Sequence, residues 1–316
     1  MNRHSFFDNI TASIGGFIAG NMKFFANSVQ SASFEKHIAA AELESPIISG
    51  EGIFEIKAKT LVGELDSAIR VAKWMGNDYP SIIYHHGNNE RPFDFKKTAK
   101  NTFYKILAKQ KESVEANLIV VRAPFHNCSL SCYQEKMTEL KNFVAMISAS
   151  VKLNEVLIQY IKGETKEAVI TTGISLGGWV TNLHRSIYNS STAYVPLLAG
   201  TFLGEVLLKS KYRKLTSDLA LNNPDQIKSV LNFDELFQTI KTRNIFPLLC
   251  KYDQFIEYNV QQESFRDYPL KTIEYGHVTG SLNTEKLKEH ILEVLNYCKC
   301  DISSLTLQEM AKSLKR

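Results

Sequence analysis

The sequence contains little glycine and little proline, with 16 Gly and 8 Pro among 316 residues. This scarcity excludes collagen-like and low-complexity chains, which need far more of both. An excess of one charge sign is lacking too: 37 Lys and Arg face 33 Asp and Glu, giving a formal net charge of +4. A nucleic-acid partner is therefore not expected. Because 44% of the residues are apolar and 22% are charged, the composition predicts a globular protein rather than a disordered one.

Cysteine is also sparse, with five residues in the whole chain. An odd number in a long chain is typical of reduced thiols and favours a cytoplasmic location over a disulfide scaffold. His126, Cys128 and Cys132 lie close together, but no second Cys or His pair has the spacing that would complete a tetrahedral metal site. Neither a metal nor another cofactor is predicted.

Long hydrophobic runs are absent, and no stretch of eighteen residues lacks charged and polar interruptions, so no transmembrane helix is predicted. Near the N-terminus, apolar residues recur at helical spacing from Phe7 to Val29. This pattern predicts an amphipathic helix within an N-terminal extension over residues 1–49, since a signal peptide would have a continuous apolar core. We expect the helix to dock on the domain surface. The alternative is a peripheral membrane contact through residues 6–29, whose polar face offers few cations.

From residue 50 onward the pattern becomes that of a sheet. Residues 54–58 and 69–73 alternate between apolar and polar, which predicts two antiparallel strands with one solvated face. Short apolar blocks, which predict strands buried on both faces, follow at 81–84, 118–121, 168–171, 193–198, 245–252 and 270–275. Helical periods lie between blocks, at 95–107 and 137–151. The order predicts an α/β fold with a mostly parallel central sheet flanked by helices.

One interval between these blocks is too long for an ordinary connection. Residues 201–244 carry apolar side chains at helical spacing, and we expect a crossover helix and a helical cap there. Helical patterns also occur at 287–297 and 305–314. The resulting division is an α/β domain over residues 50–300 and a C-terminal helix over residues 301–316.

A Gly-x-Ser-x-Gly match lies in residues 172–178, Thr-Gly-Ile-Ser-Leu-Gly-Gly. It follows a predicted buried strand and opens a helical segment. A sharp turn from strand to helix would expose the hydroxyl of Ser175, the small neighbours would avoid clashes, and the helix N-terminus would favour developing negative charge. The stretch predicts a nucleophile at Ser175. The alternative is a glycine-rich turn with an incidental serine.

A nucleophilic serine needs a base, and the base needs an orienting carboxylate. Asp253 lies at the end of one predicted strand and His277 directly after the next. The order Ser175, Asp253, His277, with each residue at the tip of a parallel strand, predicts a catalytic triad. The alternatives are an N-cap role for Asp253 and an ordinary loop histidine. Glu257 and Asp267 compete for the acid role, but neither follows a strand directly.

The third requirement is an oxyanion hole. After the first buried strand, Gly87 lets the backbone turn so that the amide of Asn88 can face the serine, and Leu176 would supply the second amide. The two histidines before Gly87 suggest metal binding, but they have no partner at ligand spacing. His184 and His290 lie in helical segments, where we expect them at the surface.

From about residue 50 to residue 298, the sequence resembles the α/β-hydrolase superfamily. The resemblance rests on a His-Gly pair after a buried strand, Gly-x-Ser-x-Gly-Gly at the nucleophile elbow, Asp253, and the Gly-His pair that ends at His277. It implies that Ser175 is the nucleophile, His277 the general base and Asp253 its orienter, with Asn88 and Leu176 as oxyanion donors. Residues 122–127 depart from a loop that many members carry, so subfamily and substrate stay open.

The activity that the resemblance implies is cofactor-free serine hydrolysis of a carboxylic ester in a small-molecule acyl substrate, through an acyl-enzyme, as in a carboxylesterase or lipase. Thioester or amide and peptide hydrolysis on the same triad are alternatives, as is a non-catalytic hydrolase-like scaffold. Because the three triad residues lie far apart in sequence, a single sheet must gather them, which favours one domain.

Overall fold

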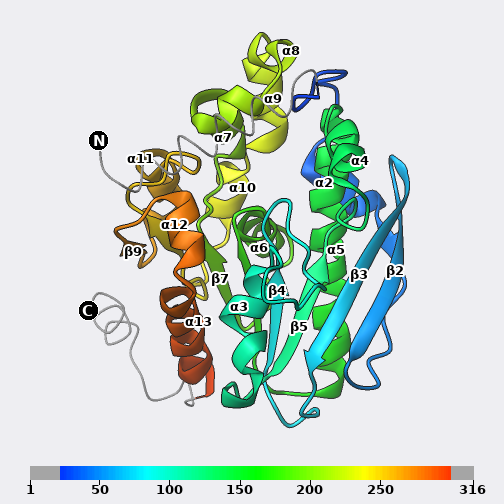
Figure 1. Ribbon diagram of the computed structural model, residues 1–316, viewed down its shortest axis with the longest axis vertical. Helices are drawn as coiled ribbons and strands as arrows, with labels where there is room; N and C mark the ends of the chain where they lie inside the picture. Colours follow the sequence, from blue (N-terminus) through cyan, green and yellow to red (C-terminus); the bar gives the residue numbers. More distant parts are fainter. Residues whose placement is uncertain (1–21, 300–316) are drawn as a thin grey trace.

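The computed structural model describes residues 22–299. Its centre is a nine-stranded sheet with the strand order β1-β2-β3-β5-β4-β6-β7-β8-β9 (Figure 1). The strands are β1 Glu42–Leu43, β2 Gly52–Thr60, β3 Gly63–Lys73, β4 Ser81–His85, β5 Asn117–Arg122, β6 Val169–Ile174, β7 Ala193–Leu197, β8 Leu248–Cys250 and β9 Lys271–Ile273. Strands β1, β2 and β3 pair antiparallel, as do β3 and β5, and every other pairing is parallel. The prediction of a mostly parallel α/β sheet is confirmed.

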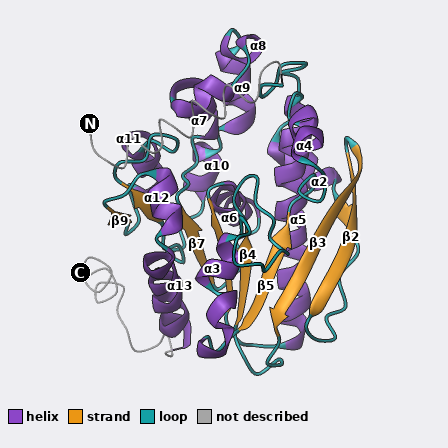
Figure 2. Ribbon diagram, in the orientation of Figure 1, coloured by secondary structure: helices purple, strands orange, loops and turns teal. Residues whose placement is uncertain are grey.

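Helices cover both faces of this sheet (Figure 2). The α-helices are α2 Phe34–Ala40, α3 Thr102–Ile106, α4 Leu130–Lys136, α5 Leu140–Glu164, α6 Leu176–Ile187, α7 Leu203–Lys209, α8 Asp218–Leu221, α9 Pro224–Leu231, α10 Asp234–Thr239, α11 Tyr258–Gln261, α12 His277–Leu282 and α13 Thr284–Lys299. Three short 3₁₀ helices are η1 Ala108–Ser113, η2 Lys211–Leu215 and η3 Gln262–Phe265.

Strand β4 shows how the sequence divides the core between the two layers of helices. All five of its residues are buried, as its continuous apolar run predicts. Because neighbouring side chains on a strand point to opposite faces, Ile82 and Tyr84 pack in one cluster with Ile106 of α3 and Leu287 of α13. Ile83 packs in a different cluster, with residues of α5. The carboxyl end of β4 is thus held rigidly between two layers.

Helix α5 is long and apolar enough, by length and composition, to cross a membrane. Most of its apolar residues are buried inside the domain, and Leu153 and Leu157 contact the sheet cluster. The apolar character of α5 is therefore accounted for by the protein core.

The sequence predicts a helix up to Val29, but the described residues of that segment, 22–29, are not helical. Residues 22–30 form irregular chain, in which Phe25 has a positive φ of 62° and is fully buried, and Val29 is buried too. Backbone N–H groups here donate to other segments, from Phe24 to Leu215 and from Phe25 to Met137. At Phe25 and Val29 the apolar spacing therefore reflects burial of an irregular segment rather than a helical face. Residues 1–21 lie outside the described residues, so a membrane contact over 6–29 stays a prediction.

The helix expected over 95–107 is much shorter in the structure, where only α3 forms. Asn101 caps α3 by accepting a hydrogen bond from Tyr104 N, and its amide group donates to the carbonyls of Pro92 and Asp94. Residues before Asn101 are therefore held as a loop, in which Phe95 stacks under the guanidinium of Arg70. Likewise, α5 begins only at Leu140.

The surface positions expected for His184 and His290 are wrong, because both side chains are fully buried. His184 bonds to the Tyr194 hydroxyl and to Glu155, each at 3.1 Å. His290 bonds to the carbonyl of Phe246 at 2.9 Å. Both helices pack with these histidines facing inward, and polar partners from neighbouring segments compensate for their burial.

The segment 201–244 contains α7, η2, α8, α9 and α10. Helices α7, α8 and α9 lie beyond the carboxyl ends of the parallel strands, at the top of Figure 1, whereas α10 lies lower and packs against α6. The structure therefore has helices in the segment where the sequence predicts a helical cap. The helix expected over 305–314 lies outside the described residues.

Candidate active site

Ser175 stands at the turn between β6 and α6, with φ 54° and ψ −108°. This left-handed conformation costs a non-glycine residue roughly 1–3 kcal/mol. The surroundings impose it: Ser175 N donates to the carbonyl of Leu197 at 2.9 Å, and its own carbonyl accepts from Trp179 N at 3.1 Å. Gly177 lies against the carbonyl of His85, so closely that a Cβ atom there would overlap it. The turn therefore presents the serine hydroxyl at the carboxyl edge of the sheet.

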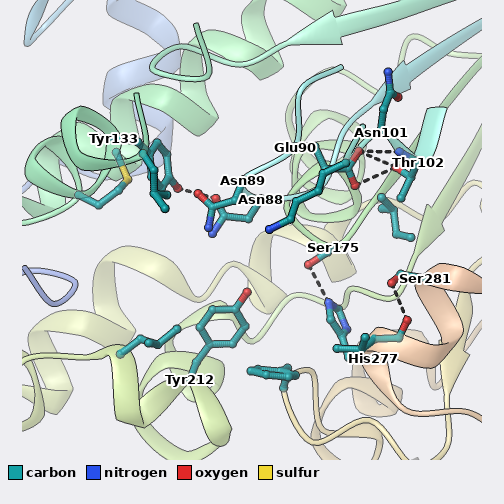
Figure 3. A pocket seen from close by; sticks show the side chains of 18 of the residues that line it. Asn88, Asn89, Glu90, Asn101, Thr102, Tyr133, Ser175, Tyr212, His277 and Ser281 are labelled. Carbon is teal, nitrogen blue, oxygen red and sulfur yellow. Dashed lines mark hydrogen bonds between the residues drawn. The ribbon is translucent and has the colours of Figure 1, made fainter. Parts of the chain in front are cut away.

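His277, the first residue of α12, joins the serine to the acid. Its Nε2 lies 3.1 Å from Ser175 Oγ, and its Nδ1 lies 2.7 Å from Asp253 Oδ2. With the Nδ1 proton donated to the carboxylate, the Nε2 lone pair faces the serine hydroxyl, which is the tautomer a general base needs. The structure thus brings the three predicted triad residues into one hydrogen-bonded chain, of which Figure 3 shows the contact between Ser175 and His277.

Asp253 is held in place independently of the histidine. It follows β8, and its Oδ1 accepts hydrogen bonds from Phe255 N at 2.9 Å and Ile256 N at 2.7 Å. The side chain is only 1% exposed. These two amides fix the carboxylate so that its second oxygen points at His277, and the competing acids Glu257 and Asp267 take no part in that contact.

The loop after β4 places Gly87 and Asn88 in the wall of the same cavity as Ser175. The side-chain oxygen of Asn88 accepts a 2.5 Å hydrogen bond from the hydroxyl of Tyr133. His86 Nδ1 donates to the carbonyl of Gly87 at 2.6 Å, and its Nε2 accepts from Ala123 N at 3.1 Å. The loop is thus braced on both sides. Leu176 opens α6 directly after the serine, where a helix leaves its first N–H groups unpaired. The oxyanion roles of Asn88 and Leu176 stay predictions.

The two histidines before Gly87 form a buried aromatic cluster with a third. The rings of His85 and His86 stack at 4.9 Å, and His126 contacts His86 edge-on at 4.4 Å. Burial lowers the pKa of His85 to about 3 and that of His126 to about 4, and it places the pKa of His86 well below its usual value. All three are neutral near pH 7. Within residues 22–299, no group of three or more His, Cys, Asp or Glu side chains is arranged to hold a metal.

A cavity of about 500 Å³ opens at Ser175 and His277. Aromatic and aliphatic side chains line one part, namely Phe24, Met137, Tyr212, Leu215 and Phe255. Two contacts join members of this set: Phe24 N donates to the Leu215 carbonyl at 2.8 Å, and the rings of Tyr212 and Phe255 meet edge-on at 5.1 Å. The cavity therefore has room beside the serine for an apolar group.

Polar and charged side chains line another part of the cavity, and Figure 3 shows Glu90, Asn101 and Thr102 there. Glu90 accepts hydrogen bonds from the backbone N–H of Thr102 at 2.8 Å and from its hydroxyl. Desolvation nevertheless raises the pKa of Glu90 to about 7. Sequence reasoning did not single out this wall, because no motif marks it. The one sequence signal for it is the cluster of polar residues that follows Asn88.

Comparison with known proteins adds to this geometry. No family model and no curated protein matches the chain. Among solved structures, an acylaminoacyl peptidase from Pyrococcus horikoshii aligns at TM-score 0.56 and 13% identity, over 84% of this chain and 44% of that one. The acetyl xylan esterase 1 of a Thermoanaerobacterium species aligns at 0.54 and 13%, over 83% and 90%. An esterase from Pyrococcus furiosus aligns at 0.52 and 14%, over 80% and 97%.

The chain has the α/β-hydrolase fold. It spans less than half the length of the peptidase and most of the length of the two esterases. At these identities the likeness establishes the fold, so the chemistry must be argued from this chain's own residues. In an α/β-hydrolase fold, a nucleophile elbow with histidine and acid following on later strands is a suitable arrangement for acyl transfer.

Proposed function

We propose that the protein is a serine hydrolase that cleaves a carboxylic ester through an acyl-enzyme. The observation that carries the proposal is the hydrogen-bonded chain from Ser175 through His277 to Asp253, at the edge of a cavity that can admit a substrate. A buried structural network would not need a serine in a strained backbone conformation facing a cavity.

The proposed reaction has two halves. Ser175 Oγ attacks the ester carbonyl carbon while its proton passes to His277 Nε2, and the Oγ–C bond forms. The backbone N–H groups of Asn88 and Leu176 stabilise the negative oxygen of the tetrahedral intermediate. As the C–O bond to the leaving alcohol breaks, His277 returns the proton to that alcohol. A water molecule then attacks the acyl carbon while His277 takes its proton. The Oγ–C bond breaks, His277 returns the proton to Ser175 Oγ, and the acid is released.

Two considerations favour an ester over the alternatives. Both esterases among the reported structural neighbours are aligned over nearly their whole length, whereas the peptidase is aligned over less than half of its chain. The cavity is also lined by aromatic and aliphatic side chains, which suit the acyl chain of a carboxylesterase or lipase substrate. Thioesters and amides present the same carbonyl to the same groups and are the competing substrates.

Replacing Ser175 with Ala tests the assignment. Because the nucleophile is removed, we expect kcat/KM on a p-nitrophenyl ester to fall by at least about a thousandfold, with the circular dichroism spectrum unchanged. The matched control is Ser229→Ala in α9, an exposed serine that does not line the cavity, and it should retain full activity. Undiminished ester hydrolysis in S175A would overturn the proposal.

A further inference from the structure

Three positively charged side chains line the polar part of the cavity and the hollow beside it. Lys100 and Lys105 line the cavity of Ser175, and Arg91 and Lys100 line a smaller adjoining hollow of about 270 Å³. Among the described residues, no Asp or Glu forms an ion pair with any of these three cations. Unpaired cations gathered at one opening attract anions.

Glu90 does not neutralise this charge. It is the acid that lines both hollows, and Thr102 satisfies its carboxyl oxygens through the backbone N–H and the hydroxyl. With a pKa of about 7, it carries about half a negative charge at neutral pH, against three positive ones. The opening is therefore electropositive.

The charged wall lies on the side from which the leaving group departs. Helix α12 begins with His277, which delivers the proton to the leaving group, and it carries Ser281 into the cavity. Figure 3 shows Ser281 and Thr102 on the same side of Ser175, with Tyr133 and Tyr212 on the other side. Lys100 and Lys105 flank Asn101 and Thr102 in the chain. Lys105 lies one helical turn after Thr102 in α3 and therefore belongs to the leaving-group side. Lys100 lines both hollows, the smaller of which also includes Tyr133, so it stands between this side and the aromatic wall, which faces the acyl side.

We infer that the substrate is an ester with an apolar acyl chain and an alcohol that bears an anionic group, such as a carboxylate or a phosphate, which Lys100 and Lys105 bind. The inference rests on the proposed function, since it concerns the leaving half of the same hydrolysed ester. Arg91 lines only the smaller hollow, so it adds to the attraction for the anionic group without contacting the reacting bond.

The test compares matched phenyl esters of one short acyl chain. One ester has 4-hydroxybenzoate as its leaving group, and the other has the neutral methyl 4-hydroxybenzoate. We compare kcat/KM for the anionic ester with kcat/KM for the neutral ester. The double variant Lys100→Gln/Lys105→Gln should lower the ratio of the first to the second by about tenfold, since two partly exposed charge contacts are lost. The kcat/KM for the neutral ester should change less than twofold. The wild-type ratio should fall as ionic strength rises.

Controls separate the possible results. Lys109→Gln removes an exposed lysine of η1 that does not line the cavity, and it should leave the ratio unchanged. An ester of 3-hydroxyphenyl phosphate distinguishes a phosphate from a carboxylate preference, and either preference supports the inference. The inference is overturned if K100Q/K105Q leaves this ratio unchanged. It is also overturned if the double variant slows only the hydrolysis of a hemisuccinate ester, whose anionic group lies on the acyl side. If the wild type hydrolyses none of these esters, the proposed function itself fails.

Discussion

Glu90 is a carboxyl group whose charge changes near neutral pH, a few residues after the proposed oxyanion loop. Desolvation raises its pKa to about 7, and the hydrogen bonds from Thr102 and the positive charge of Lys105 oppose this rise only in part. The protonated form can donate a hydrogen bond to a bound ligand, whereas the ionised form reduces the positive charge of the opening. The state of this one residue therefore modulates the polar wall of the cavity.

Glu90→Gln should change how stability depends on pH. The pKa of Glu90 is higher in the folded protein than its ordinary value of 4.5, so the favourable protonated state is fully present below about pH 4.5. Its contribution is lost as pH rises towards 7. We expect the free energy of unfolding of the wild type to fall relative to E90Q by about 2 kcal/mol across that window, allowing for partial solvent screening.

Urea denaturation at a series of pH values measures this difference. Glu112→Gln, at an exposed position of η1, is the matched control and should run parallel to the wild type. If the free energies of unfolding of E90Q and the wild type differ by a constant amount from pH 4.5 to 7, Glu90 is not desolvated as the structure places it.

At the scale of elements, the turn from β6 into α6 depends on glycines that allow close approach. Gly177 of α6 lies against the carbonyl of His85 at the end of β4, and Gly178 lies against Ala199 after β7. The helix that begins at Leu176 can therefore lie directly on the strand ends. The backbone of Ser175 is held in its strained conformation by this packing rather than by its own preference.

Gly177→Ala should destabilise the protein, because the new Cβ would overlap backbone that cannot move without displacing β4. We expect a loss of about 3 kcal/mol or more in the free energy of unfolding, with loss of ester hydrolysis. Gly163→Ala in α5 is the matched control, since no atom lies within 4 Å of a Cβ there. That variant should gain up to about 1 kcal/mol, because alanine is the better helix former. Equal stability of the two variants, measured by urea denaturation, would contradict this account of the turn.

The elements that the sequence predicts correctly are those whose burial is local and continuous. Strands β4, β5 and β6 appear as unbroken apolar runs because they are covered on both faces. Strand β7 forms although it contains Pro196, which has no backbone N–H to donate. On either side of the proline, Tyr194 N and Leu198 N donate to the carbonyls of Asn244 and Leu248, so this edge of β7 is paired without a proline N–H.

Two predicted helical stretches, the described part of the one up to Val29 and the start of the one over 95–107, are not helical for the same physical reason: tertiary hydrogen bonds override a helical spacing. The chain around Phe25 is held by backbone bonds to Met137 and Leu215, and the loop before α3 is held by the side chain of Asn101. Such partners lie far away in sequence or depend on one side-chain orientation. Periodicity alone cannot reveal them.

At the scale of the whole molecule, the sheet gathers residues 102 positions apart into one contact between Ser175 and His277. The positions of these residues could be predicted, because the carboxyl ends of parallel strands lie along one edge of a sheet. The residues that form the walls of the cavity could not be predicted from the sequence. Tyr133, Tyr212 and Lys105 come from three helices whose relative placement depends on packing, and their residue types are ordinary in a protein of this composition.

The most direct test of the central claim, that Ser175 is an activated nucleophile, is reaction of the full chain with a fluorophosphonate probe, followed by mass spectrometry. The serine oxygen bonds to phosphorus and fluoride leaves, a reaction that an unactivated serine does not undergo at a useful rate. We predict one adduct per chain, mapped to the peptide that contains Ser175, with labelling strongly reduced in His277→Ala. An intact, folded chain that acquires no adduct, or acquires one at another residue, would contradict the account.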